Sequence, residues 1–239
     1  MLERLTERIW FLPGEEETDR PYLYYVNGDE KSLAIDAGNS PAHVEKFYRA
    51  LEAEDLRKPE ITVLTHWHWD HTFGMRAVVG KTAASTRTNE KLRQVRNWEW
   101  TRESMDLREE TGEDISFCNE CIRKEYGNLE EIQVVPADLE VGDRLDIALG
   151  GVTCRLLHRD SPHSRDALFA YFPEVKTLAV GDAVCGDLYE NGGNSDPEKL
   201  KALIGFLEFT DFEHCLLGHD RPCGKAELLK ALREDLDEC

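Results

Sequence analysis

A dense group of metal-binding side chains follows one apolar segment of this chain. Residues 62–75 read TVLTHWHWDHTFGM, and four of the six positions from 66 to 71 are His66, His68, Asp70 and His71. The preceding ITVLTH is typical of a buried strand, on which alternate residues point to the same side. We therefore expect His66, His68 and Asp70 to form one row. His71 is expected to turn toward a neighbouring point once the chain leaves the strand.

These side chains are of the types that zinc and similar ions prefer as ligands. Imidazole nitrogens and carboxylate oxygens bind zinc at about 2.0–2.2 Å. Four such groups within six residues can begin two metal sites but cannot complete either of them. For this segment alone, a surface loop with hydrogen-bonded histidines is the competing interpretation.

Three further candidate ligands lie downstream. His163 is in the loop segment RDSPHSRD, ahead of a predicted strand. Asp182 in LAVGDAV and His219 in CLLGHDRP directly follow apolar strands. Loops on a rigid scaffold commonly carry functional residues. Any one of the three, taken alone, is more simply an ordinary loop residue.

The complete set resembles the metallo-β-lactamase superfamily, whose signature is HxHxDH followed by a distal histidine, an aspartate and a final histidine. All seven positions are filled in that order, by His66, His68, Asp70, His71, His163, Asp182 and His219. Asp36 in LAIDAGN also matches the aspartate of an early strand motif of the family. The resemblance extends through nearly the whole chain.

The resemblance implies an α/β (α+β) fold, built as a four-layer αβ/βα sandwich with the metals in a cleft at the edge of two sheets. The first metal is then held by His66, His68 and His163, and the second by Asp70, His71 and His219. Asp182 bridges the two. The expected cofactor is two Zn²⁺ ions, with iron or manganese as alternatives because both metals suit the same ligand types.

The implied function is that of a dinuclear metal-dependent hydrolase. A carboxylate between two cations lowers their repulsion, and a shared water can ionise near neutral pH. The resulting metal-bridging hydroxide would attack a small ester, thioester, lactone or related substrate, with Asp70 as the catalytic residue. Two alternatives stay open: a persulfide-dioxygenase-like oxidoreductase with one iron, and a non-catalytic metal-binding module.

This sequence departs from particular branches of the superfamily, and these departures narrow the range of expected substrates. A β-lactamase is not favoured, because Asp182 lies in a part of the chain where the closest zinc class uses a cysteine ligand, and no export signal is recognisable. Quorum-quenching lactonases place a tyrosine three residues after the bridging aspartate, where this chain has Cys185, with Tyr189 further on. The chain after His219 is too short for the helical substrate-binding domain of glyoxalase II.

Residues 86–131 differ in composition from the rest of the chain. They are highly charged and contain two glycines and no proline, which indicates exposed helices. We expect a single domain over residues 1–239, with this helical insert covering the active-site cleft. Its apolar residues Trp98, Trp100, Met105 and Phe117 either line the substrate pocket or attach the insert to the core. A homodimer interface is another use for the insert.

Two residues are candidates for substrate binding. Trp67 lies between two of the histidines, and Arg221 follows the last predicted ligand. In contrast, Cys118 and Cys121 form a single CxxC with no second pair, and we expect ordinary cysteines there rather than a zinc ribbon.

Composition restricts the partners. The net charge of -19 repels polyphosphates, so a small-molecule substrate is expected and nucleic acid is not. No apolar segment is long enough to cross a membrane. Seven cysteines and no recognisable export signal favour reduced thiols and a cytoplasmic location.

The remaining pattern predicts a domain of two halves, each made of strands followed by helical segments. IWFLPG, PYLYYVNGD and KSLAIDAGN indicate strands, and a helix is expected from Pro41, capped by Ser40. Strand patterns return in IQVVPADLE, DRLDIALGGVTCRLLH, ALFAYFPE and KTLAVGDAV, with a hairpin turn at Gly150–Gly151. PEKLKALIGFLEF and GKAELLKALREDL indicate the last two helices.

Overall fold

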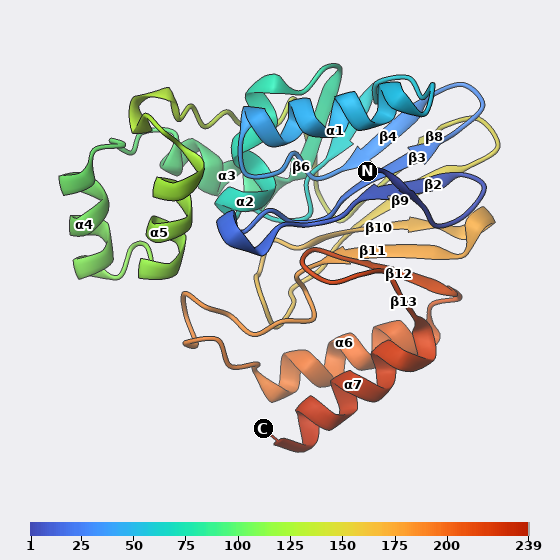
Figure 1. Ribbon diagram of the computed structural model, residues 1–239. Coiled ribbons are helices and arrows are strands. Elements are labelled where there is room, and N and C mark those ends of the chain that lie inside the picture. Colours follow the sequence, from blue (N-terminus) through green and yellow to red (C-terminus); the bar gives the residue numbers. More distant parts are fainter. Residues whose placement is uncertain (239) are drawn as a thin grey trace.

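Two β-sheets lie face to face between layers of helices in the computed structural model, which describes residues 1–238 (Figure 1). The first sheet contains, in spatial order, β1 (Glu3–Arg4), β2 (Ile9–Leu12), β3 (Leu23–Asn27), β4 (Ser32–Ile35), β5 (Ile61–Val63), β6 (Lys81–Ser85) and β7 (Leu139–Val141). The second contains β13 (Cys223–Gly224), β12 (His214–Leu217), β11 (Thr177–Gly181), β10 (Leu168–Phe172), β9 (Thr153–His158) and β8 (Arg144–Ala148).

Helices cover the outer face of each sheet. Helix α1 (Pro41–Ala53) packs on the first sheet, and α6 (Pro197–Phe209) and α7 (Lys225–Glu238) pack on the second (Figure 1). The other helical segments are α2 (Trp69–Thr72), α3 (Thr86–Val95), α4 (Arg102–Thr111), α5 (Ser116–Glu125), η1 (Glu16–Thr18), η2 (Phe73–Ala77), η3 (Leu129–Glu131) and η4 (Pro173–Val175). The four layers confirm the predicted sandwich.

Strand alternation explains how the first sheet joins two layers. In β3, Tyr24 and Val26 face the core between the sheets, whereas Leu23 and Tyr25 face α1. All four side chains are buried. Because successive residues on a strand point to opposite faces, a nearly continuous apolar run serves a sheet that is covered on both sides.

Helix α1 begins where the sequence predicts. The Ser40 hydroxyl accepts a hydrogen bond from the backbone N–H of His43 at 3.1 Å, and Pro41 occupies the first turn. The buried face includes Val44, Phe47 and Leu51, which pack against the first sheet. Capping and the spacing of the apolar residues therefore both act to fix this helix.

Parallel strands bring several loops to one edge of the sandwich. Strands β4, β5 and β6 are parallel in the first sheet, as are β11 and β12 in the second. The sheets are tied together there, since the Leu168 N–H donates to the Thr65 carbonyl at 2.7 Å and the Tyr24 hydroxyl donates to the Leu217 carbonyl at 2.6 Å. Loops at the carboxyl ends of these strands consequently meet.

Two predicted strands are shorter than expected, and His66, His68 and Asp70 do not form one row along a strand. Strand β5 ends at Val63, so His66 lies in a bend and His68 directly precedes α2, while Asp70 and His71 lie in α2. The ladder stops because the Thr65 N–H donates to the Asp36 carboxylate at 2.7 Å. In IQVVPADLE, only Leu139 and Glu140 belong to a strand, because β7 spans Leu139–Val141.

Strand β7 is short for the same kind of reason as β5. The N–H of Ala137 donates to the Asn89 side chain at 2.7 Å, and that of Asp138 donates to the Thr82 hydroxyl at 2.9 Å. Side chains thus replace the backbone partners that a longer strand would have had.

Within residues 1–238, no helix combines the length and the hydropathy required to cross a bilayer.

The helical insert lies at one side of the sandwich, where α4 and α5 project from it (Figure 1). Trp100 and Met105 are buried in a cluster that includes Phe73, so these two residues attach the insert to the core. Trp98 is half-buried against the same cluster, and Phe117 is 49% exposed. The apolar residues of the insert therefore do not act as one wall.

Candidate metal centre

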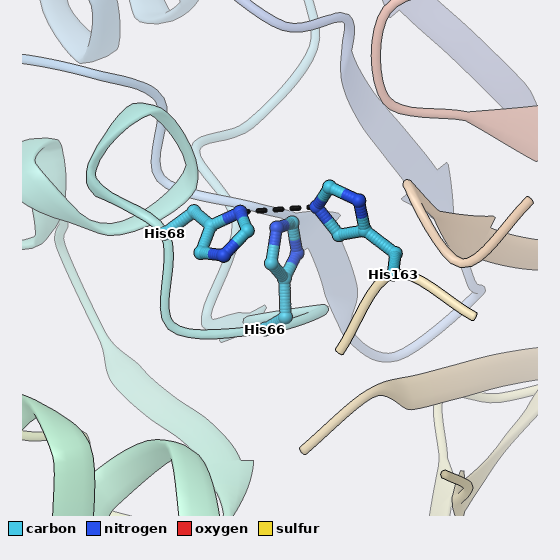
Figure 2. Close-up of side chains that lie close together, drawn as sticks. All are labelled: His66, His68 and His163. Atoms are coloured by element: carbon cyan, nitrogen blue, oxygen red, sulfur yellow. Dashed lines mark hydrogen bonds between the residues drawn. The ribbon is translucent and has the colours of Figure 1, made fainter. Parts of the chain in front are cut away.

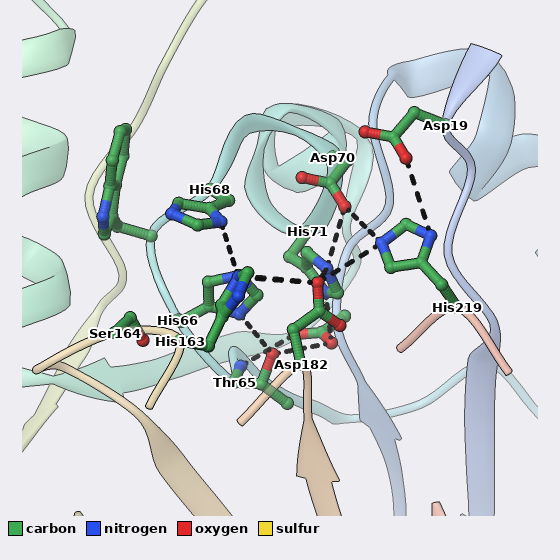
Figure 3. Close-up of polar contacts among 12 residues, drawn as sticks. Asp19, Thr65, His66, His68, Asp70, His71, His163, Ser164, Asp182 and His219 are labelled. Carbon is green, nitrogen blue, oxygen red and sulfur yellow. Dashed lines mark hydrogen bonds and ion pairs between the residues drawn. The ribbon is translucent and has the colours of Figure 1, made fainter. Parts of the chain in front are cut away.

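The seven predicted ligands meet at the edge of the sandwich in two adjoining groups. One group contains His66, His68 and His163 (Figure 2), and the other contains Asp70, His71, Asp182 and His219 (Figure 3). Within each group, one ligand atom from every residue lies within 4.8 Å of the others. Six of the seven residues are buried.

Two glycines allow these loops to converge. Gly181 ends β11 in a left-handed conformation, with φ at 56°, and packs closely against Thr65. Gly218 follows β12, and a Cβ atom at that position would overlap the Asp182 carboxylate. A residue with a side chain cannot approach so closely, which is why glycine is needed before both Asp182 and His219.

One oxygen of Asp182 faces both groups. Its Oδ2 lies 3.3 Å from Nε2 of His71 and 3.4 Å from Nε2 of His219. The same oxygen lies 3.7 Å from Nε2 of His163 and 4.0 Å from Nε2 of His66 (Figure 3). A carboxylate between two sets of imidazoles is suited to bridging two cations.

The outer nitrogens of the histidines are held by other parts of the protein. His71 Nδ1 lies 2.7 Å from Asp36, and His163 Nδ1 donates to the Gly186 carbonyl at 2.9 Å. His66 Nδ1 lies 3.0 Å from the Thr65 hydroxyl. Such contacts fix the ring tautomer and orient Nε2 of each of these three rings toward the centre.

His68 differs from these three. Its Nδ1 faces inward and lies 3.0 Å from Nε2 of His163 (Figure 2).

Several polar atoms of the two ligand groups lack a hydrogen-bond partner. Among the described residues, His66 Nε2, His71 Nε2 and Asp182 Oδ1 are buried and unpaired. His71 Nε2 does lie 2.8 Å from Asp70 Oδ2, but this contact is an ion pair without hydrogen-bond geometry. Unpaired buried polar atoms are unfavourable. A divalent cation would satisfy them, so the donor set fits a metal.

The charges of the cluster also fit cation binding. Burial lowers the pKa of His66 and of His68, and neighbouring histidines lower both further. Burial acts in the same direction on His71, but Asp70 and Asp182 outweigh it and raise its pKa well above the usual value. The carboxylates thus favour positive charge at this position, which a bound cation would supply.

Two residues beside the ligands, Asp19 and Tyr189, are not predicted from the sequence to lie there. Asp19 Oδ1 lies 3.6 Å from His219 Nδ1 (Figure 3). The Tyr189 ring lies 5.0 Å from the His68 ring and 5.2 Å from that of Trp67. Asp19 sits in an acidic run without a motif, so no sequence signal distinguished it from the chain's many other acids.

A cleft of about 560 Å³ opens beside the first ligand group. His68, His163, Trp67 and Tyr189 line one part of it. The insert lines another part through Arg87, Glu90, Lys91, Gln94, Gly112 and Glu113, and the segments near His163 and Tyr189 complete the wall with Ser164, Arg165, Asp166, Asp187 and Glu190. The predicted substrate residue Trp67 therefore faces a cavity next to the candidate metal ligands.

The other predicted substrate residue lies elsewhere. Arg221 forms an ion pair with Glu3, and its guanidinium lies 5.6 Å from the Phe11 ring centroid. It lines a separate hollow bordered by α7. The structure thus brings Trp67 to the cleft beside the ligands and leaves Arg221 outside it.

The cysteines do not join the described ligand groups. Cys118 and Cys121 are buried on α5, and neither belongs to a metal-binding group within residues 1–238. The six cysteines of the described part are free thiols. Cys239, the seventh, lies outside the described residues. Cys118 has a different contact, because its Sγ lies 3.5 Å from the Tyr189 hydroxyl.

The fold and this cluster define a class of αβ/βα sandwich proteins with a His/Asp site for divalent metals. The family model of the metallo-β-lactamase superfamily matches residues 19–210, and the chain belongs to that superfamily.

Solved structures share the fold at low sequence identity. A metallo-β-lactamase from Pontibacter korlensis is 17% identical with a TM-score of 0.66, over 100% of this chain and 99% of that one. A sec-alkylsulfatase, Pisa1 from Pseudomonas sp., is 15% identical with a TM-score of 0.68, over 99% of this chain and 41% of that one.

Two curated relatives match over short segments. Atrochrysone carboxyl ACP thioesterase from Aspergillus fumigatus is 33% identical over 63 residues, which are 26% of this chain and 20% of that protein. Hydroxyacylglutathione hydrolase from Cronobacter sakazakii is 41% identical over 61 residues, 25% of this chain and 22% of that protein. The matched segments thus span about a fifth of each relative.

Proposed function

We propose that this protein is a dinuclear metal-dependent hydrolase of a small thioester, ester, lactone or related substrate. The observation that carries the proposal is the position of Asp182, whose Oδ2 faces histidines of both ligand groups at 3.3–4.0 Å. A single-metal protein has no need for a carboxylate shared between two complete ligand groups.

The first position is assigned to His66, His68 and His163, and the second to Asp70, His71 and His219, with Asp182 between them. Two Zn²⁺ ions suit this donor set, and iron or manganese suits the same ligand types. Such ions would lower the pKa of bound water toward neutral pH and would polarise a substrate carbonyl oxygen.

Asp70 is assigned the role of orienting the attacking water. Burial acts to raise the pKa of Asp70, but His71 and His219 outweigh it and hold that pKa well below the usual range. The carboxylate therefore stays ionised and accepts hydrogen bonds, but it is too weak a base to retain a proton. Its Oδ2 lies 3.0 Å from His219 Nε2, which keeps the group directed into the centre.

The cleft beside His68 is assigned to the substrate. Trp67 and Tyr189 offer flat apolar surfaces close to the ligands, and Lys91 Nζ lies 4.6 Å from the Trp67 ring centroid. We propose a single domain in which the insert, residues 86–131, forms the opposite wall of this cleft. A small molecule of suitable shape would place its reacting carbonyl against the ligands with its remaining part along Trp67.

A thioester is the favoured substrate bond. One matching relative is named a thioesterase and the other hydrolyses a hydroxyacylglutathione, which is also a thioester. The net charge of -19 favours a small molecule over nucleic acid. The cytoplasmic location stays a prediction from the sequence.

The test is metal analysis followed by a substrate panel. Purified protein should contain two transition-metal ions per chain and hydrolyse at least one of a series of thioesters, esters, lactones, phosphodiesters and β-lactams. His66→Ala should abolish turnover. One iron per chain with oxygen consumption would instead identify an oxidoreductase, and metal without turnover on any substrate would indicate a binding module.

A further inference from the structure

We propose that Asp19 is a positioning residue for His219, and that the helical insert fixes Asp19 through Arg20 and Glu125. The insert would then influence the affinity of the second position for its metal. This inference rests on the proposed function, because it assigns His219 to the second metal.

The two nitrogens of His219 face different partners. Nε2 lies 3.0 Å from Asp70 Oδ2 and 3.4 Å from Asp182 Oδ2, on the metal-binding side. Nδ1 lies 3.6 Å from Asp19 Oδ1 (Figure 3). A carboxylate on the outer side favours the tautomer with its proton on Nδ1, and this leaves the Nε2 lone pair for a metal.

His219 needs such a partner more than the other ligands do. Its side chain is 34% exposed, whereas the side chains of His71 and His163 are 0% and 5% exposed. Packing therefore constrains the His219 ring least. The outer contact with Asp19 is left to set its orientation.

The backbone of Asp19 is shaped for this contact. Its φ of 55° is left-handed, a conformation that residues other than glycine rarely adopt. Aspartate tolerates this conformation better than most residues do. It persists only where neighbouring structure holds it. The segment around Asp19 must accordingly be anchored.

The insert provides that anchor. Arg20 Nη2 and Nε donate to the two carboxylate oxygens of Glu125, the last residue of α5, at 2.7 and 3.2 Å. The Glu125 side chain is only 3% exposed, and it also accepts a hydrogen bond from Ser40. A bidentate and largely buried pair of this kind is both strong and directional.

A second link runs through Asn39. The Tyr126 hydroxyl donates to the Asn39 carbonyl at 3.0 Å, and the Asn39 side chain donates to the Thr18 carbonyl at 2.7 Å. The residues on both sides of Asp19 are thus tied to the end of α5. No corresponding link from these residues to His66, His68 or His163 is present in the described part of the chain, so only the second position depends on it.

The experiment measures metal retention in the full chain. Metal-free wild-type protein and variants are loaded with Zn²⁺, dialysed, and analysed for zinc per chain, with affinities from chelator competition. Asp19→Asn should retain one zinc where the wild type retains two, with the weaker affinity reduced about 10–100-fold. Arg20→Met and Glu125→Gln should reduce the same affinity by a smaller factor.

Asp19→Gly separates charge from backbone shape. Glycine favours a positive φ, so a purely structural role in the turn would survive this substitution. We expect Asp19→Gly to lose the second zinc as Asp19→Asn does. Asp29→Asn is the matched control, because Asp29 is an exposed acid paired with Arg8 and should leave both affinities unchanged.

Retention of two zinc ions at wild-type affinity by Asp19→Asn or Asp19→Gly overturns the inference and leaves the proposed function standing. Equal weakening of both zinc ions also overturns it, because the effect would not be specific to His219. A wild-type protein that takes up no metal overturns both the inference and the proposed function.

Discussion

Asp36 Oδ2 lies 2.7 Å from His71 Nδ1, and both side chains are buried. The same carboxylate accepts the Thr65 hydroxyl at 2.9 Å, which leaves the Thr65 oxygen to accept from His66 Nδ1 at 3.0 Å. Asp36 therefore orients one histidine from each ligand group. Through the Thr65 N–H it also ends strand β5, so the local fold and the geometry of the site share one carboxylate.

Asp36→Asn is expected to weaken both metal positions together. Asparagine tolerates the positive φ of 63° found at this position, so the backbone need not move. The negative charge behind His71 is lost, and metal affinity should fall about 10–100-fold at each position. Chelator competition measures it, and this result differs from the loss of one metal expected for Asp19→Asn. Loss of a single metal, or of none, would contradict the role given to Asp36.

The spatial grouping of the seven candidate ligands could be predicted from the sequence, because four of them are close in the chain and the order of all seven is specific. HWHWDH places four candidate ligands within six residues, and the other three lie next to predicted strands. Asp36 was also found, through its strand motif. The strand expected through His66 was wrong because a side chain 29 residues away takes the Thr65 N–H out of the ladder.

Contacts between distant loops could not be read from the sequence. Asp19 and His219 are 200 residues apart in the chain, and the Arg20–Glu125 pair joins segments 105 residues apart. Neither pair has a periodicity or a motif. The sequence leaves the role of the insert open for the same reason, since Trp100 and Met105 attach it to the core while Gly112 and Glu113 line the cleft.

Gly218→Ala is expected to damage the metal centre. The added Cβ would overlap the Asp182 carboxylate, so Asp182 must move or the loop must shift. We expect a loss of about 1–3 kcal/mol in the free energy of unfolding and clearly reduced metal content. Urea denaturation and metal analysis are the measurements.

Gly205→Ala is the control for this substitution. Gly205 lies within α6, and a Cβ atom added there would meet no other part of the protein within 4 Å, so alanine should stabilise the protein by about 0.5–1 kcal/mol. Wild-type metal content in Gly218→Ala would show that Asp182 does not need its present position.

Tyr189 is expected to serve stability through its hydroxyl and substrate binding through its ring. The hydroxyl donates to Asp114 Oδ1 at 3.2 Å, and Asp114 is buried. Tyr189→Phe should therefore cost about 1–3 kcal/mol of unfolding free energy with little change in KM. Tyr189→Ala should raise KM as well, because the ring beside His68 and Trp67 is removed. Equal KM values for the two variants would exclude a role for the ring.

His43 is expected to limit stability in mild acid. Burial, aided by the charge of Arg20, lowers the pKa of His43 to about 3. Because the folded-state pKa lies below the unfolded value of about 6.5, the unfolded chain binds the extra proton first, and stability falls as the pH drops below about 6.5. From this residue alone, the free energy of unfolding should decrease by about 2 kcal/mol between pH 7 and pH 5. His43→Leu should remove that part of the decrease in urea denaturation series, whereas His214→Gln, at a half-buried histidine, should not. Parallel pH curves for His43→Leu and the wild type would mean that His43 gains its proton without unfolding.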